Sequence, residues 1–314
     1  TKNYRVFRKL IGKKVMFMAV VKSNAYGHNI HEFAKEMEQR GVDWLGVDSI
    51  TEALALRKEG VKIPILVLGF TLPSQYESAR KEGIAITISS LVQMRELLLL
   101  SHSKKQLRVH IKVDTGMHRQ GFQLDEARGL LLALQNSALG IVVEGLYTHF
   151  AEAKNPRNGD TTKRQIAEFE TWRTLFHEAG HNLICHASAT GGALLYKQAH
   201  YDMVRIGIGC YGLWPSGEAE HYCARNITLT PVLTWKSIVS EVKEVKIGER
   251  VGYDLTHMLT RNSKLAVIPV GYWHGIPRLH SSKGSVLIRG KRAGIVKRNS
   301  MDMIVVNVTD IPQI

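Results

Sequence analysis

The strongest constraint on the fold is a repeated alternation of short apolar segments with helix-like segments. Eight segments rich in aliphatic residues have the length and composition of buried strands: residues 15–21, 44–47, 64–69, 84–89, 107–113, 142–149, 183–188 and 203–208. Eight such strands separated by amphipathic helices predict an α/β fold, a parallel (β/α)8 barrel of the TIM type. An open doubly wound sheet is the alternative, because a local pattern does not show closure.

The pattern changes near Thr228, after which short strands and turn residues follow without a helix-like segment. Residues 304–308 alternate in the manner of a half-buried strand. We therefore expect a smaller all-β C-terminal domain, with a barrel over residues 1–222 and the β domain over residues 223–314. Because the chain stops soon after a predicted strand, we expect that this domain is truncated at its C-terminus.

The charge balance favours an anionic ligand. Lys and Arg outnumber Asp and Glu by 42 to 28, which gives a formal net charge of +14. Nucleic acid is one candidate partner, but the basic residues are spread along the chain without a dense tract or interleaved aromatic residues that would stack on bases. The excess is better explained by a solvated surface together with a site for a small anion.

Cysteine content and hydropathy indicate the compartment. The three cysteines form no pattern, which argues against a disulfide framework and favours a reducing environment. No apolar run approaches membrane-spanning length, and the start does not look like a signal peptide. These features predict a cytoplasmic protein without a membrane partner.

A single lysine, Lys22, comes at the carboxyl end of the first predicted strand. A lysine beside apolar residues is partly desolvated, and desolvation favours the neutral amine that forms imines. The alternative is an ordinary lysine that extends its amine to solvent. His149 and Arg205 also lie in or at the end of predicted strands, and active sites of such barrels gather at the carboxyl ends of the strands.

Residues 207–212 spell G-x-G-x-x-G directly after the eighth predicted strand. This motif is weak as a dinucleotide fingerprint, because it does not follow the first strand and no helix pattern follows it. It is better suited to holding a phosphate, since barrel phosphate sites lie after the last two strands. Glycine used for tight packing at a barrel exit is the competing explanation.

Three other features have less weight. Residues 177–181 match the zinc-peptidase pattern H-E-x-x-H, but Gly180 is a natural helix stop that would place the second histidine beyond the helix, so we expect no metal site. Lys112 and Arg119 flank a strand end and could bind an acidic substrate, although surface cations would look the same. Tyr253 is a lone tyrosine in a β segment, where packing is the commoner role.

Taken together, these segments resemble the alanine racemase family, whose members use pyridoxal phosphate and fold as an α/β barrel with a β domain. The resemblance covers nearly the whole chain. It rests on the segments VVKSNAYGH (20–28), KVDTGMHR (112–119), MVRIGIGCYG (203–212), VGY (251–253) and SMD (300–302). The family has Ala where Ser23 stands and Cys where Ser300 stands.

The resemblance implies how a pyridoxal 5'-phosphate cofactor would be held. Lys22 would carry it as a Schiff base, and Arg205 would face the pyridine nitrogen. The phosphate would be held by Tyr26, Thr190 and the N–H groups of Gly207 and Ile208. The family has a serine near this point, so Ser188 is an alternative to Thr190, but the spacing to Arg205 favours Thr190.

The resemblance also implies a two-base racemisation of alanine in a homodimer with shared active sites. Lys22 would serve one face of the α-carbon and Tyr253 of a second subunit the other, because one base reaches only one face. His149 would bridge to Arg205, and Arg119 would bind the substrate carboxylate with the support of Lys112, which is carbamylated in some relatives. Met301 would make a backbone contact, and Tyr272 would act as a gate. The product D-alanine would supply peptidoglycan.

One further departure affects specificity. Trp273 and His274 stand where the family has Ala and Asp, which bears on the access channel and substrate size. The chain also ends before the family's last segment, which helps set substrate size, so serine or broad-specificity racemases are alternatives within the family. A non-catalytic pyridoxal-phosphate carrier is an alternative of another class, although the β domain and Tyr253 argue against it. Pyridoxal-phosphate decarboxylases share the two domains but match the motifs less well.

Overall fold

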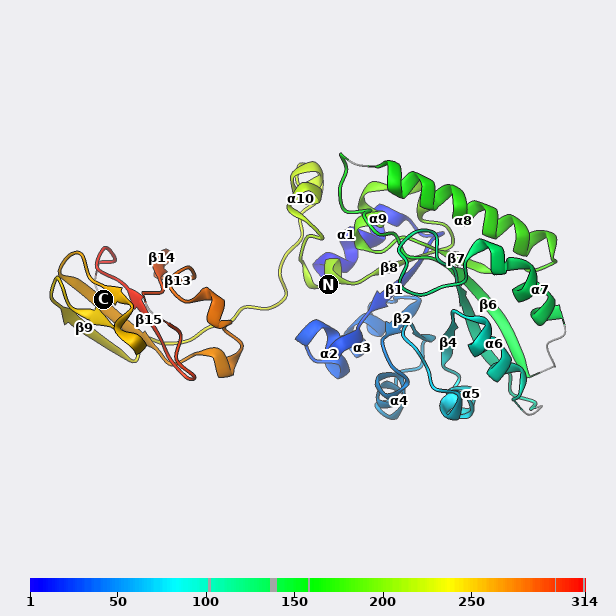
Figure 1. Ribbon diagram of the computed structural model, residues 1–314, viewed down its shortest axis with the longest axis horizontal. Coiled ribbons are helices and arrows are strands. Elements are labelled where there is room, and N and C mark those ends of the chain that lie inside the picture. Colours follow the sequence, from blue (N-terminus) through cyan, green and yellow to red (C-terminus); the bar gives the residue numbers. More distant parts are fainter. Residues whose placement is uncertain (101–102, 136–139, 158, 297, 313) are drawn as a thin grey trace. The chain divides into compact units, whose positions relative to one another are not determined.

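The chain consists of two compact units. The computed structural model describes residues 1–100, 103–135, 140–157, 159–296, 298–312 and 314. The first unit is Thr1–Leu233 and the second is Thr234–Ile314 (Figure 1). The first unit extends past residue 222, where we expected the barrel to end, because Leu229 is buried in its hydrophobic core.

The first unit is built on eight parallel strands in the order β7-β6-β5-β4-β3-β2-β1-β8. Backbone hydrogen bonds from Asp202 to Cys185 (3.1 Å) and from Arg205 to Ser188 (2.9 Å) join the two end strands. The sheet therefore closes, and the predicted TIM-type barrel is confirmed. The strands are β1 (Met16–Val20), β2 (Trp44–Val47), β3 (Ile65–Val67), β4 (Ala85–Ile88), β5 (Leu107–Lys112), β6 (Ile141–Tyr147), β7 (Ile184–His186) and β8 (Met203–Ile206).

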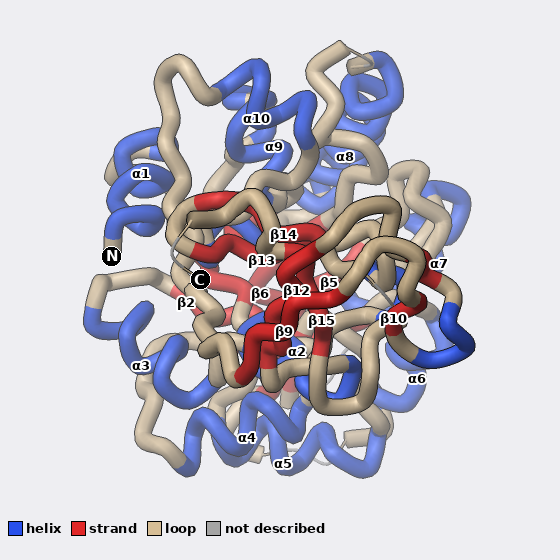
Figure 2. The backbone as a smooth tube through the Cα atoms, turned by 90° about the vertical axis from the view of Figure 1, so that its left-hand side faces the viewer, coloured by secondary structure: helices blue, strands red, loops and turns tan. Residues whose placement is uncertain are grey.

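Helices surround these strands as an outer ring (Figure 2). Their apolar faces pack on the strands in one continuous core, which is why each strand reads as an almost uninterrupted apolar run. The helices are α1 (Lys2–Ile11), α2 (Lys22–Gly27), α3 (Ile30–Gln39), α4 (Ile50–Lys58), α5 (Tyr76–Glu82), α6 (Leu91–Leu98), α7 (Ala127–Gln135), α8 (Asp160–Glu178), α9 (Thr190–Leu195) and α10 (Gly217–Cys223).

The second unit is all β, as predicted. A three-stranded antiparallel sheet has the order β15-β12-β9, and two hairpins pair β10 with β11 and β13 with β14. Its own small core includes Ile268, Ile304 and Val306, which makes it a unit with separate packing. The strands are β9 (Glu241–Val245), β10 (Arg250–Val251), β11 (His257–Met258), β12 (Ser263–Ile268), β13 (Ser285–Ile288), β14 (Lys291–Gly294) and β15 (Ile304–Asn307).

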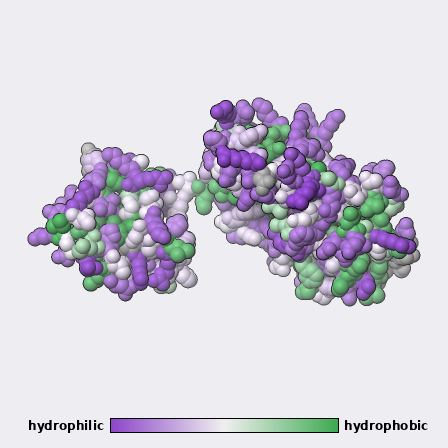
Figure 3. All heavy atoms as spheres, turned by 45° about the horizontal axis from the view of Figure 1, so that its top comes forward, coloured by the Kyte–Doolittle hydropathy of each residue, from purple (hydrophilic) through white to green (hydrophobic). Residues whose placement is uncertain are grey.

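The surface is mostly polar, and the cysteine thiols are buried. In the view of Figure 3 hydrophilic residues dominate both units, with smaller apolar patches among them. None of the helices in the described part of the chain is long and apolar enough to cross a membrane. The three cysteines are unpaired and buried.

Candidate active site

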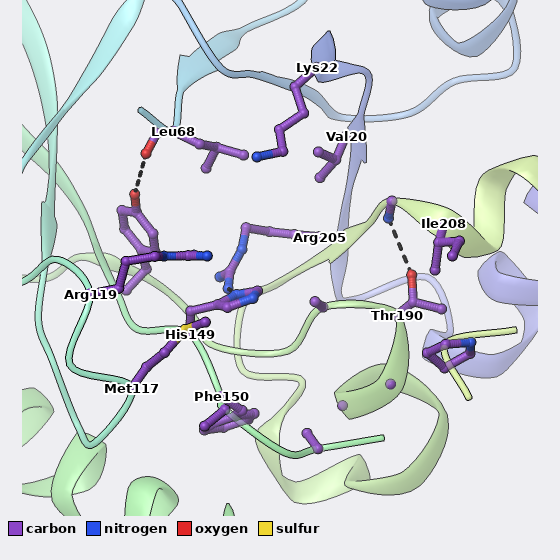
Figure 4. A pocket seen from close by; sticks show the side chains of 18 of the residues that line it. Val20, Lys22, Leu68, Met117, Arg119, His149, Phe150, Thr190, Arg205 and Ile208 are labelled. Carbon is purple, nitrogen blue, oxygen red and sulfur yellow. Dashed lines mark hydrogen bonds between the residues drawn. The ribbon is translucent and has the colours of Figure 1, made fainter. Parts of the chain in front are cut away.

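A cavity of about 740 Å³ opens at the carboxyl ends of the barrel strands. Side chains from several strand ends converge on it (Figure 4). Nine of the twelve predicted site residues line it, which are Lys22, Tyr26, Lys112, Arg119, His149, Thr190, Arg205, Gly207 and Ile208. Segments far apart in the sequence therefore meet here because parallel barrel strands all end at one face.

Lys22 is presented by a left-handed turn. It follows β1, and the next four residues, Ser23–Tyr26, have φ between 53° and 55°, a conformation that costs free energy for non-glycine residues. Hydrogen bonds offset part of this cost: Asn24 N donates to Glu52 Oε1 (3.3 Å), and Asn24 Oδ1 accepts from Ile30 N (2.9 Å). The labelled α2 is thus not an ordinary helix, and its turn directs Lys22 into the cavity (Figure 4).

The Lys22 amine has a carboxylate partner. Its Nζ lies 3.2 Å from Asp48 Oδ1, and 39% of the lysine side chain is exposed. The sequence predicted a lysine among apolar residues, whereas in the structure Lys22 forms an ion pair with Asp48, the residue that directly follows β2. Asp48 lines the same cavity as the cations Lys22, Lys112, Arg119 and Arg205.

A compact cradle forms where β8 ends. Thr190 Oγ1 accepts from the backbone N–H groups of Gly207 and Gly209, both at 3.3 Å. A Cβ at Gly207 would lie 2.6 Å from Tyr26 Oη. Glycine is therefore required for this close approach, and the Tyr26 hydroxyl, the Thr190 hydroxyl and the backbone after β8 face one small space suited to an anion.

We predict that Gly207→Val weakens phosphate-ester binding by more than about tenfold, because the new side chain displaces Tyr26 Oη. The measurement is the dissociation constant of pyridoxal phosphate by fluorescence titration. Gly217→Val serves as the control, since a Cβ there meets nothing within 4 Å. Equal affinities in the two variants would contradict the assignment of the cradle.

Arg205 is buried at the floor of the cavity, with 3% exposure. Its Nη1 donates to His186 Nδ1 (2.8 Å) and its Nη2 donates to the carbonyls of Thr148 and Ala187, both at 2.8 Å. Burial lowers the pKa of the guanidinium to about 10, so it stays charged at neutral pH. These bonds and the ring of Tyr147, 5.2 Å from the guanidinium carbon, hold the cation in one orientation.

His149 contacts the other side of the same guanidinium. Arg205 Nη2 donates to His149 Nδ1 at 3.2 Å, so the bridge that we expected between these residues is present. Burial and then the positive charges of Arg205, Arg119, Lys112 and Lys22 lower the pKa of His149 to about 3. His149 is consequently a neutral acceptor with its proton on Nε2.

We predict that His149 remains neutral at pH 5. Because its pKa in the fold lies below the ordinary value of about 6.5, the unfolded chain binds a proton there that the folded chain does not, so acidification from about pH 6.5 to 3 destabilises the fold. Two-bond ¹H–¹⁵N NMR of labelled histidines reports the ring state, and a His149→Gln spectrum assigns the signal. An imidazolium pattern for His149 at pH 5 would contradict the prediction.

Lys112, the last residue of β5, and Arg119, in the segment after β5, both line the cavity. Lys112 Nζ donates to Gln120 Oε1 at 3.2 Å, while Arg119 is exposed. The pKa of Lys112 is lowered to about 8, mainly by burial and then by the positive charges of Arg119 and Arg205. The pair therefore supplies positive charge for an acidic ligand, as the sequence suggested.

The other three predicted residues belong to the second unit. Tyr253, Tyr272 and Met301 are 66%, 42% and 47% exposed there. Tyr272 and Met301 lie near each other, because the backbone N–H of Tyr272 donates to Ser300 O (3.1 Å). Each of the three presents its side chain outward from its own unit.

Residues 177–181, which match the zinc-peptidase pattern, are not arranged as a metal site. Helix α8 ends at Glu178, and Gly180 with φ of 83° turns the chain away, so His181 lies beyond the helix as expected. Among the described residues no cluster of three or more His, Cys, Asp or Glu side chains could hold a metal ion.

Three residues at the site were not predicted from the sequence: Asp48, Tyr147 and His186. Tyr147 stacks on His186 with ring centroids 4.6 Å apart, and its hydroxyl bonds to Thr87 Oγ1 (2.8 Å). Asp48 directly follows β2, and Tyr147 and His186 are the last residues of β6 and β7, so polar or aromatic residues close to predicted strand ends are the signal that could have identified them.

Comparison with known proteins is consistent with this geometry. The model of the alanine racemase N-terminal domain matches residues 1–215, and that of the alanine racemase C-terminal domain matches residues 232–314. The chain belongs to the alanine racemase family. It is thus a member of a racemase family, as the motifs around Lys22 and Arg205 indicated.

Individual relatives agree over the length of the chain. The alanine racemase of Halothermothrix orenii is 38% identical over 314 residues, 99% of this chain and 81% of the relative. The alanine racemase structure from Clostridium difficile 630 is 30% identical with a TM-score of 0.91 and covers 100% of this chain and 81% of that one. A Bartonella henselae alanine racemase structure with covalently bound pyridoxal phosphate has a TM-score of 0.88 at 28% identity, over 99% and 84%.

Proposed function

We propose that this chain is a pyridoxal 5'-phosphate-dependent alanine racemase that interconverts L- and D-alanine and supplies D-alanine for peptidoglycan. The observation that carries the proposal is the convergence of Lys22, Arg205 and the Gly207 cradle on one cavity. The relative with covalently bound pyridoxal phosphate supports the cofactor, and a Bacillus anthracis alanine racemase structure with bound L-Ala-P (31% identical, TM-score 0.89) supports the substrate class.

The residues present fit pyridoxal phosphate. The cradle of Tyr26, Thr190 and the backbone of Gly207 and Ile208 provides donors for a phosphate, in a space that a Cβ at position 207 would fill. Arg205 provides a charged donor for a ring nitrogen. When bound, the cofactor supplies an aldehyde that condenses with amines and a ring that withdraws electrons from the substrate's α-carbon.

The chain's own residues explain the choice of racemisation. Arg205 keeps its proton at neutral pH and cannot protonate a ring nitrogen fully, which limits electron withdrawal and suits proton exchange over side reactions. Lys22, once free of the cofactor, takes or returns the α-proton on one face. Arg119, supported by Lys112, holds the substrate carboxylate.

The opposite face requires a second base. We assign it to Tyr253 of a second copy of the chain, in a homodimer whose active sites are shared, with Tyr272 as a gate and Met301 in a backbone contact. This assignment rests on the VGY segment and on the need for one base on each face of the carbon. The cytoplasmic location remains a prediction from the sequence.

The experiment is a racemase assay with cofactor removal. Purified protein is freed of cofactor with hydroxylamine, and D-alanine formation from L-alanine is followed with D-amino-acid oxidase before and after adding pyridoxal phosphate. We expect activity to fall below detection and to return. Conversion that does not depend on the cofactor would refute the proposal, cofactor binding without conversion would favour a carrier, and faster turnover of L-serine would favour a broad-specificity racemase.

A further inference from the structure

A buried chain of polar side chains runs from Arg205 through the barrel interior. Arg205 Nη1 lies 2.8 Å from His186 Nδ1, and His186 Nε2 lies 2.9 Å from His110 Nδ1. His110 Nε2 faces Glu144 Oε2 at 3.5 Å. Both histidines are completely buried, and the four residues come from β8, β7, β5 and β6.

The chemistry of the two ends sets the direction of every donor. A guanidinium only donates, so His186 must accept on Nδ1 and carry its proton on Nε2. That proton is donated to His110 Nδ1, so His110 also carries its proton on Nε2, directed at Glu144. A carboxylate only accepts, and therefore the far end of the chain imposes the same order as the near end.

The far end is built to keep Glu144 charged. Arg108 Nε donates to Glu144 Oε2 at 2.9 Å, and its terminal nitrogen bonds the other carboxylate oxygen. Burial raises the pKa of Glu144, but the nearby His110 ring and the hydrogen bonds from Arg108 outweigh it, and the pKa lies below its ordinary value. Among the described residues His110 Nε2 makes no hydrogen bond of good geometry, and the Glu144 carboxylate at 3.5 Å is the charged group that it faces, so their interaction at this distance is electrostatic.

The backbone makes room for this arrangement. The register of β5 against β6 shifts between Val109 and His110, which marks a β-bulge. A Cβ at Gly145 would lie 2.2 Å from His110 Nδ1, so only glycine leaves space for the imidazole. The register shift at His110 and the glycine at position 145 together leave room for the buried imidazole of His110.

We propose that Glu144 is a positioning residue for Arg205, acting through His110 and His186, whose Nε2–H tautomers it enforces. Reversal of His186 would place its Nδ1–H against Arg205 Nη1 and displace the guanidinium. Reversal of His110 would place its Nδ1–H against the Nε2–H of His186 and so force His186 to reverse as well. In the described part of the structure the hydrogen bonds of Arg205 come from its two terminal nitrogens, so its Nε–H is available to a ligand in the cavity. The tautomer order stands by itself, whereas its consequence for catalysis rests on the proposed function.

The first test is two-bond ¹H–¹⁵N NMR of the full chain with labelled histidine, free of cofactor, with His110→Gln and His186→Gln spectra for assignment. We expect both histidines as neutral Nε2–H tautomers at pH 7. An Nδ1–H tautomer or an imidazolium at either position overturns the proposal. This measurement does not depend on cofactor binding or activity. It therefore separates failure of the proposed function from failure of the proposed tautomer order in the relay, by which we mean Arg205, His186, His110 and Glu144.

The second test is Glu144→Gln, whose amide offers a donor as well as an acceptor and so permits the reversed order. We expect mixed tautomers, a shifted absorbance band of the bound cofactor and a roughly tenfold lower kcat with KM nearly unchanged. Glu144→Asp, which keeps a carboxylate, should restore the order. Glu36→Gln, which breaks an exposed pair with Arg40 (2.8 Å), is the matched control. Unchanged tautomers in folded Glu144→Gln overturn the role of Glu144, whatever its rate.

Discussion

Replacement of Lys22 by alanine is expected to abolish covalent cofactor attachment and to lower racemase activity by on the order of 10⁴-fold or more. Lys22 is the amine that follows β1 and extends into the cavity that Arg205 and the cradle also line (Figure 4). The measurement combines borohydride reduction and peptide mass spectrometry with the rate of D-alanine formation. The wild-type chain should yield one modified peptide, which contains Lys22.

The matched control for Lys22 is Lys35→Ala. Lys35 pairs with Glu59 at 2.8 Å and its side chain is 44% exposed, close to the 39% of Lys22, but it lies on α3 and does not line the cavity. This variant should keep wild-type trapping and activity. If Lys22→Ala still traps the cofactor covalently in similar yield, the assignment of Lys22 is wrong.

Tyr253→Phe is expected to slow α-proton exchange from one enantiomer of alanine by between about 10²- and 10⁴-fold and from the other far less. The reason is that each base serves one face, so loss of the hydroxyl leaves the lysine's face intact. Deuterium incorporation from D₂O into L-alanine and D-alanine, followed by NMR at early times, measures the two rates separately. Tyr222→Phe is a suitable control, since Tyr222 is 67% exposed and Tyr253 66%.

Equal slowing of both enantiomers would count against two opposed bases. The shared-site arrangement has a separate check, in which Lys22→Ala and Tyr253→Phe chains are mixed. Each heterodimer would contain one site with both residues intact and one with neither, so about half of the wild-type activity per heterodimer should return. Verified heterodimers without activity would refute shared sites.

The fold was predictable because its signal is local and repeated. Eight apolar strands and their helices follow from periodicity, and their number favours a barrel, but closure is decided by the hydrogen bonds between the two end strands. The left-handed turn at Ser23–Tyr26 was not predictable in this way, because four non-glycine residues adopt it only with the hydrogen bonds of Glu52 and the side chain of Asn24. The extension of the first unit to Leu233 likewise depends on packing of Leu229 that no local pattern marks.

The candidate site was predictable to the extent that single residues carry its chemistry. Lys22, Arg205 and Gly207 stand at strand ends, where a barrel gathers its functional groups, and their motifs resemble one family. Asp48 and Tyr147 were missed, because acidic and aromatic residues are common at strand ends. Their roles are visible only from their contacts, which are Lys22 for Asp48 and Arg205 for Tyr147.

The sequence by itself determined the order of strands and helices, the all-β C-terminal unit and the presence of a lysine, an arginine and a glycine cradle at barrel strand ends. Tertiary structure alone decided which partners these groups have. The relay from Arg205 through His186 and His110 to Glu144 joins four strands, and its donor order arises because a cation at one end and a carboxylate at the other leave each imidazole one choice of tautomer. Hydrogen-bond direction is a property of neighbours in space, and only the closed barrel brings these neighbours together.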